Sequence, residues 1–209
     1  VHVVSTIDDI CWTLNIRGND IDFFPLVLSY GIITMDSFEL YIDEKKLDDK
    51  LKAKLAKDGV NLHPYNDIYE DVKKFGSDVV AMIDPGKLNY ALFNNIPENV
   101  KTVEKRNPAI LMKAIKNPVE IENIRKAQIK DSVAHVRFMK WLKENVGKMR
   151  ITEMSASDKL DEFRAEMGNF IRPSFEPISS FGEHGAIVHY TSSPETDVEL
   201  KEGQLFLTD

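Results

Sequence analysis

Hydrophobic positions in the first hundred residues alternate between the spacing of strands and that of helices. Runs rich in Val, Ile, Leu and Tyr, which are typical of strands, cover residues 1–5, 26–34, 38–42 and 79–83. Between the last two runs, Leu47, Leu51 and Leu55 recur every four residues and Gly59 follows, which predicts a helix with an apolar stripe and a glycine stop. The continuous run 79–83 predicts a strand buried on both faces. Strands that alternate with helices predict a three-layer α/β unit.

The pattern changes after a proline-containing segment at residues 106–118. Pro118 suits the first turn of a long helix that runs to Val146, and a second helix is expected from Thr152 to Gly168. Short strand-like runs and Ser- and Gly-rich turns follow. Two helices followed by strands predict an α+β domain. We therefore expect two domains, residues 1–111 and 112–209.

Composition and charge exclude several classes of partner. The chain has 209 residues, with 27 Lys and Arg against 34 Asp and Glu, so it has no basic surface for nucleic acid or anionic lipid. No apolar run approaches the roughly 20 residues of a membrane helix. The single cysteine, Cys11, cannot form an internal disulfide, which favours a reducing compartment. We expect a cytoplasmic protein without nucleic-acid or membrane partners.

The two ends of the chain both lie inside structured patterns. Val1 already belongs to an apolar run, and the strand-like residues before Asp209 stop without a turn. We therefore expect these 209 residues to be a piece of a longer polypeptide.

Most charged and histidine residues have ordinary structural explanations. His2, His63 and His135 are scattered without a second ligand at metal-binding spacing, so structural or surface roles are favoured. Acidic pairs such as Asp8–Asp9 fit helix starts or solvated helix faces. None of these residues indicates a site.

Two residues near the C-terminus are less easily explained. In a strand expected over residues 186–190, His189 shares a face with Ile187, so it either has a buried partner, the commoner case, or lines a cavity. Asp209 falls on the face of Leu205 and Leu207, where a carboxylate needs a hydrogen bond, an ion pair or a metal. Alternatively, the strand ends at Asp209 and its carboxylate is solvated, which is the simpler interpretation of a lone terminal Asp.

Several short runs, in order along nearly the whole chain, resemble the cytosolic aminopeptidase P (Xaa-Pro aminopeptidase) family of pita-bread metallopeptidases. These runs are DDICWTLNIRGND at 8–20, HPY at 63–65, KNPVE at 116–120, KD at 130–131, GAIVHY at 185–190, PET at 194–196 and LFLTD at 205–209. The resemblance implies the second, creatinase-N-terminal-like α/β domain of a three-domain member. A truncated, N-terminal half of the pita-bread α+β catalytic domain would follow it.

The resemblance also implies roles for individual residues. Asp209 would be the first of five metal ligands, which in the family are two Asp, one His and two Glu, and the other four would lie downstream. His189 matches the family histidine that contacts substrate and is described as a proton shuttle. His184 stands where a common family form has Asn, and its role stays open.

The implied chemistry is hydrolysis by two divalent metal ions. Ligands rich in carboxylates suit Mn²⁺, with Co²⁺ or Zn²⁺ as competitors. Two such ions can hold a bridging hydroxide and polarise the scissile carbonyl of a peptide with proline in second position. The resemblance further implies that the parent protein is a homodimer, and we expect the 209 residues alone to be inactive.

Two other functions compete with this interpretation. The parent could be a pita-bread protein without metals that binds peptides or proteins, but His189 and Asp209 are both retained, which favours an enzyme. It could also be a related hydrolase such as a prolidase or creatinase. The run around Arg17 and Gly18, which resembles three-domain members, argues against that class.

Overall fold

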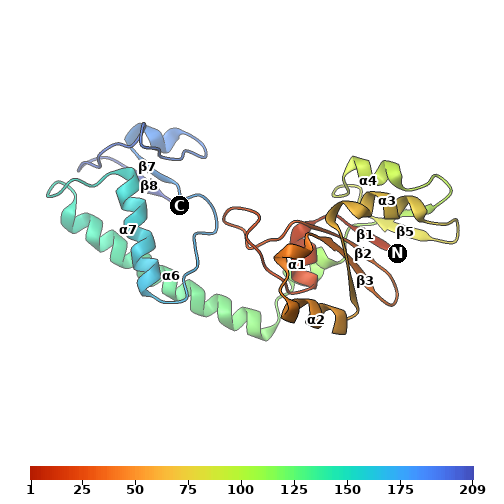
Figure 1. Ribbon diagram of the computed structural model, residues 1–209. Coiled ribbons are helices and arrows are strands. Elements are labelled where there is room, and N and C mark those ends of the chain that lie inside the picture. Colours follow the sequence, from red (N-terminus) through yellow and green to blue (C-terminus); the bar gives the residue numbers. More distant parts are fainter. The chain divides into compact units, whose positions relative to one another are not determined.

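The computed structural model describes all 209 residues, which form two compact units (Figure 1). The first unit comprises Val1–Lys116 and the second Asn117–Asp209. No helix in either unit is both long enough and apolar enough to cross a membrane.

A six-stranded mixed sheet forms the centre of the first unit. Its strands are β1 (His2–Val4), β2 (Ser29–Ile33), β3 (Phe38–Ile42), β4 (Val60–His63), β5 (Val80–Ile83) and β6 (Lys101–Glu104), in the order β4-β3-β2-β1-β5-β6. Strands β1, β2 and β3 pair antiparallel, with Tyr30 opposite Tyr41, whereas the β3–β4, β1–β5 and β5–β6 pairs are parallel.

Helices cover both faces of this sheet and bury a separate core on each. Successive strand residues point to opposite faces, so Val4 and Leu40 join one core while Val3 and Tyr41 join the other. The first core includes residues of α1 (Ile7–Thr13) and α2 (Asp49–Lys57). The second includes residues of α3 (Ile68–Asp71), the 3-10 helix Val72–Lys74 and α4 (Tyr90–Asn95). The predicted three-layer α/β arrangement is confirmed.

Helix α5 (Ala109–Ala114) is held to α1 by a buried carboxylate. Asp9 is only 2% exposed and accepts hydrogen bonds from the Thr6 hydroxyl (2.6 Å), the Asn107 amide (2.8 Å) and the Lys113 ammonium (2.6 Å). Lys113 also pairs with Asp8. Asp8 and Asp9 lie in the first turn of α1, as the sequence predicts, and Asp9 also forms a buried contact with α5 that the pattern does not indicate.

Two parts of the first unit differ from the sequence pattern. Val80 in β5 is 46% exposed, so this strand is not buried on both faces as predicted. Strand β6 and the six-residue helix α4 were not indicated by the pattern. Strand β6 lies at the sheet edge, where its polar residues Lys101, Thr102 and Glu104 face solvent and leave no apolar alternation.

The second unit opens with the long helix α6 (Pro118–Asn145). Asn117 accepts a hydrogen bond from the backbone N–H of Glu120 (2.9 Å), and the Glu120 side chain accepts one from the N–H of Asn117 (2.8 Å). This capping box, with Pro118 in the first turn, starts the helix where the sequence predicts it. Helix α7 (Glu153–Glu166) packs against α6 through a core that includes Phe138, Leu160 and Phe181.

The end of the second unit contains a short two-stranded sheet. Strands β7 (Ser179–Phe181) and β8 (Phe206–Thr208) pair antiparallel, with Ser180 opposite Leu207. The prediction of a strand over residues 186–190 is wrong. A 3-10 helix (Gly182–Ala186) and a turn stand there instead, and the Tyr190 N–H bonds to the Ile187 carbonyl (3.2 Å). Residues such as Ile187 and Val188 favour strands only beside a neighbouring strand, and the β7–β8 ladder ends at Phe181.

Candidate functional site

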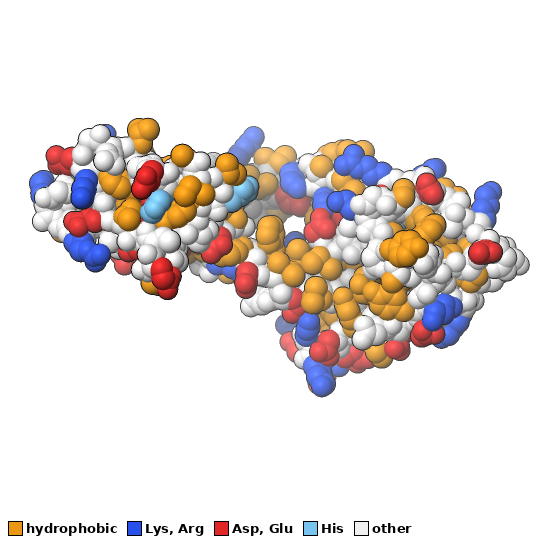
Figure 2. Space-filling model, turned by 90° about the horizontal axis from the view of Figure 1, so that it is seen from above, with side chains coloured by type: hydrophobic (Ala, Val, Ile, Leu, Met, Phe, Trp, Pro, Cys, Tyr) orange, Lys and Arg blue, Asp and Glu red, His pale blue; other side chains and the backbone are white.

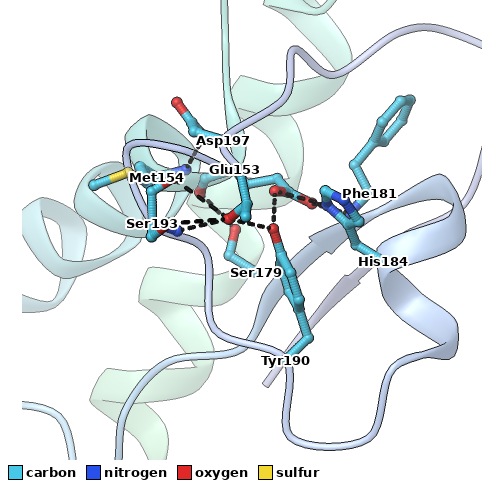
Figure 3. Close-up of polar contacts among 9 residues, drawn as sticks. Glu153, Met154, Ser179, Phe181, His184, Tyr190, Ser193 and Asp197 are labelled. Atoms are coloured by element: carbon cyan, nitrogen blue, oxygen red, sulfur yellow. Dashed lines mark hydrogen bonds and ion pairs between the residues drawn. The ribbon is translucent and has the colours of Figure 1, made fainter.

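A buried glutamate lies at the start of helix α7 and faces the segment that follows β7 (Figure 3). Glu153 is the first residue of the helix and is fully buried (0% exposed). Its backbone is fixed on two sides, because its N–H donates to the Val198 carbonyl (3.1 Å) and its carbonyl accepts from the Ser179 hydroxyl (2.6 Å). The carboxylate is thus held in one place by neighbours far away in the sequence.

The carboxylate of Glu153 accepts three hydrogen bonds from one segment of chain. The Phe181 N–H lies 2.6 Å from Oε1, His184 Nδ1 lies 2.9 Å from Oε1 and 3.1 Å from Oε2, and the Tyr190 hydroxyl lies 3.0 Å from Oε2. A carboxylate only accepts hydrogen bonds, so this geometry assigns the proton of the His184 ring to Nδ1. Burying a carboxylate is costly without such partners, and here each oxygen is bonded.

The two aromatic partners of Glu153 also contact each other. The rings of His184 and Tyr190 stack with centroids 4.4 Å apart and planes inclined by 28°. Burial and the adjacent Glu153 carboxylate outweigh the opposing contact with Thr196 and raise the pKa of Tyr190. Tyr190 therefore stays protonated at neutral pH and can donate its hydroxyl hydrogen.

His189 lies in the turn directly before Tyr190 and is exposed. Its φ angle is +57°, in the left-handed region that residues other than glycine rarely adopt. Because the segment is not a strand, the shared face expected for His189 and Ile187 does not exist; both side chains are exposed. On the face drawn in Figure 2, histidine side chains of the second unit reach the surface beside hydrophobic side chains.

Asp209 follows β8 and continues its pairing by two backbone hydrogen bonds to Ile178 (2.9 and 3.1 Å). Its side chain is exposed and lines a cavity of about 200 Å³ together with Arg164, Arg172 and Phe175, among others. His189 does not line this cavity. Strands over both segments would place His189 and Asp209 on neighbouring strands that face one cleft. His189 lies in a turn, so this strand placement is wrong, and a shared substrate site for the two residues stays a prediction.

The described residues do not assemble a metal centre by themselves. No group of three or more His, Cys, Asp or Glu side chains is placed to hold an ion. Asp209 could supply a single carboxylate ligand to such a centre.

The other histidines have structural surroundings. His63 is bonded to Glu39 (2.7 Å) and stacks on Tyr41. His135 lies 3.5 Å from the Asp131 carboxylate, and burial lowers the pKa of His2.

Both units match known protein families. Residues 1–120 match the creatinase/prolidase N-terminal domain, and residues 122–209 match metallopeptidase family M24. The chain therefore belongs to the family of proteins with a creatinase/prolidase N-terminal domain, and its second unit is similar to metallopeptidase family M24. The fold class expected from the sequence, an α/β domain followed by part of a pita-bread α+β domain, is confirmed.

Within this family, the chain is similar to Xaa-Pro aminopeptidases. It is 37% identical over 199 residues to a probable Xaa-Pro aminopeptidase P of Neurospora crassa, covering 90% of this chain and 29% of the relative. It is also 37% identical over 214 residues to Xaa-Pro aminopeptidase 1 of Dictyostelium discoideum, covering 99% of this chain and 33% of the relative. The chain thus spans about a third of the length of these relatives.

A solved structure matches the whole chain. The X-prolyl aminopeptidase of Caenorhabditis elegans, described as a cytosolic enzyme with a di-nuclear active site, aligns with a TM-score of 0.93 and 31% identity. The alignment covers 100% of this chain and 35% of that protein. The prolidase of Pyrococcus horikoshii aligns with a TM-score of 0.65 and 21% identity, which shows a shared fold only.

Proposed function

We propose that the polypeptide containing these 209 residues is a metal-dependent aminopeptidase that releases the N-terminal residue from peptides with proline in second position. The observation that carries this proposal is the similarity of both units together to Xaa-Pro aminopeptidases, in sequence and in structure. A match to the M24 unit alone would be compatible with other hydrolases of that family. The structural neighbour named a prolidase is more distant than the X-prolyl aminopeptidase.

The substrate class has a physical basis. Proline has no N–H and a fixed φ, so a peptidase that pairs with the N–H after the scissile bond cannot use it. An enzyme for such peptides must instead recognise the ring and the free amino group of the first residue. We propose that His189 contacts the substrate at this site, which fits its exposure next to a rigidly held tyrosine.

Asp209 is proposed as one ligand of a pair of divalent ions, Mn²⁺ in the first place and Co²⁺ or Zn²⁺ as competitors. When bound, such a pair would supply Lewis-acid activation of water and of the scissile carbonyl. The exposed carboxylate at the end of β8 supports this assignment. We further propose that the complete enzyme is cytoplasmic and homodimeric.

The test uses the complete polypeptide with Mn²⁺ and two matched peptides that differ only in Pro or Ala at the second position. We expect release of the first residue from the Pro peptide. His189→Ala should lower kcat with the metal content unchanged, whereas Asp209→Ala should lose metal and activity together. Peptide binding without cleavage would instead support a non-catalytic module, and cleavage restricted to Xaa-Pro dipeptides would support a prolidase.

The 209 residues alone provide the complementary control. Hard cations need several oxygen ligands fixed at once, and this chain brings at most one to the proposed centre. We expect no turnover and no Mn²⁺ binding tighter than about micromolar, roughly −8 kcal/mol. Tighter binding would contradict the placement of Asp209.

A further inference from the structure

We propose that Glu153 is a positioning residue, which holds the segment Phe181–Tyr190 so that His189 stands in a fixed place toward the substrate. The part of this proposal that concerns substrate rests on the proposed function. The part that concerns the segment rests on the contacts of this chain alone. His184 and Tyr190 are the two side chains through which Glu153 acts.

The three hydrogen bonds to Glu153 are spread over the whole segment. Phe181 is its first residue, His184 lies in the 3-10 helix, and Tyr190 is its last residue. A single buried carboxylate therefore ties both ends and the middle of the segment to the start of helix α7. Between the second and third anchors the chain is exposed from Gly185 to His189.

His189 depends on this anchoring more than its neighbours do. Its left-handed backbone is unfavourable for a residue with a Cβ and persists only where the surroundings fix it. The residue that follows it, Tyr190, is buried, bonded to Glu153 and stacked on His184. Loss of the carboxylate would leave the Tyr190 hydroxyl with Thr196 as its remaining partner (3.1 Å) and would allow the turn at His189 to relax.

Capping of helix α7 does not explain the buried carboxylate. The helix is already capped by Thr152, whose side chain accepts from the Ser155 N–H (3.2 Å). The Met154 N–H donates to the Asp197 side chain (3.0 Å), and the Glu153 N–H donates to the Val198 carbonyl. Since the first turn is satisfied by other groups, the Glu153 side chain is free to serve the segment after β7.

The first experiment compares Glu153→Gln with Leu160→Ala in the complete polypeptide. Gln keeps the side-chain length but replaces one acceptor oxygen by an NH₂ group. This group faces one of the donors that bond Glu153 and cannot accept its hydrogen bond. Leu160 lies on the same helix and is buried in the core that it shares with Phe181 (4% exposed), but its side chain forms no hydrogen bond. Its variant therefore lowers stability through lost packing and keeps the hydrogen bonds that anchor the segment. We expect Glu153→Gln to lower kcat about 100-fold, as for a displaced catalytic group, with KM and metal content unchanged. Leu160→Ala should keep kcat.

The second experiment is a double-mutant cycle with His189→Ala. If Glu153 acts through His189, adding Glu153→Gln to His189→Ala should lower kcat no further. Losses that multiply would overturn the proposal, because they would show two independent contributions. Equal losses of kcat in Glu153→Gln and Leu160→Ala would also overturn it, since general destabilisation would then explain the effect.

The third experiment does not depend on catalytic activity. Amide hydrogen exchange of peptides covering residues 181–190 should be faster in Glu153→Gln than in Leu160→Ala, and unchanged exchange would overturn the proposal. If the wild type cleaves no Xaa-Pro peptide, the proposed function fails, yet this comparison still decides whether Glu153 holds the segment. If Glu153→Gln does not fold, Tyr190→Phe, which removes one donor and keeps the ring, takes its place in all three comparisons.

Discussion

Each unit of this chain buries one carboxylate in the first turn of a helix, and the two carboxylates stabilise different things. Asp9 in α1 and Glu153 in α7 are 2% and 0% exposed, and each accepts from three donors. The partners of Asp9 include the Lys113 ammonium and tie one helix to another. Those of Glu153 are a backbone N–H, an imidazole and a phenol from a single segment that carries an exposed histidine.

The different partners distinguish a carboxylate that stabilises helix packing, Asp9, from one that orders a candidate functional site, Glu153. A charged pair such as Asp9–Lys113 fixes the position of α5 and exposes no chemically active group. The donors around Glu153 all come from one segment and hold an irregular turn, where a regular ladder is absent. A buried carboxylate in the first turn of a helix therefore serves packing in one unit and the ordering of a candidate site in the other.

The largest effect on stability is expected for Asp9→Asn. The amide cannot pair with the Lys113 ammonium, and its NH₂ group opposes a donor, so the free energy of unfolding of the first unit should fall by about 3 kcal/mol. Each unit has one tryptophan, Trp12 and Trp141, so urea unfolding followed by single-tryptophan fluorescence reports the units separately. An equal shift at Trp141 would contradict the assignment of Asp9 to the first unit alone.

A smaller effect is expected for Tyr190→Phe in the second unit. Only the hydroxyl is lost and the stack on His184 is kept, so unfolding reported by Trp141 should require about 1 kcal/mol less free energy. Unfolding reported by Trp12 should not change. A loss near zero would show that the Tyr190 hydroxyl contributes nothing to holding the segment.

Acid should destabilise the first unit more than the second. Hydrogen bonding with Lys46 lowers the pKa of Asp20, and bonds from Ser37, His63 and Asn61 outweigh burial and lower the pKa of Glu39. A carboxyl group whose pKa in the folded state lies below its unfolded value of about 4 stabilises the fold when the pH is above that unfolded value. This stabilisation is lost as the pH falls through the folded-state pKa. Because both groups are partly solvated, each contributes less than about 1 kcal/mol. Unfolding followed by the fluorescence of Trp12 and of Trp141 between pH 6 and pH 3 measures how much stability each unit loses.

The smallest effect is expected for His184→Asn, which introduces the residue of the common family form. An Asn amide can still donate to Glu153, so the free energy of unfolding should change by less than about 0.5 kcal/mol. His184→Leu, which has no donor, is the matched control and should cost about 1 kcal/mol or more. Equal costs of the two variants would show that the stack on Tyr190, and not the hydrogen bond, is what His184 provides.

Regular elements with local signals were predictable from the sequence. The leucine stripe from Leu47 to Leu55 and the Asn117–Pro118–Glu120 helix start lie where the pattern indicates, because capping and periodicity act within a few residues. The family resemblance also placed the fold of both units, which the comparisons confirm.

The candidate site was only partly predictable, because its order comes from distant residues. Glu153 follows a Thr at a helix start, a place typical of solvated acids, and nothing local shows that His184 and Tyr190 reach it from over thirty residues away. The apolar run before His189 has the composition of a strand but turns because no strand lies beside it. Tyr190 at the end of an apolar run was the available signal, because a buried tyrosine hydroxyl usually has a hydrogen-bond partner.

A crystal structure of the Glu153→Gln polypeptide tests most directly whether this carboxylate orders the candidate site. We expect helix α7 and the β7–β8 pair to keep their places, while residues 182–190 shift or lose order and His189 leaves the left-handed region. If His189 instead keeps a φ near +57° and Tyr190 stays in position, the segment holds itself and the account of Glu153 is contradicted.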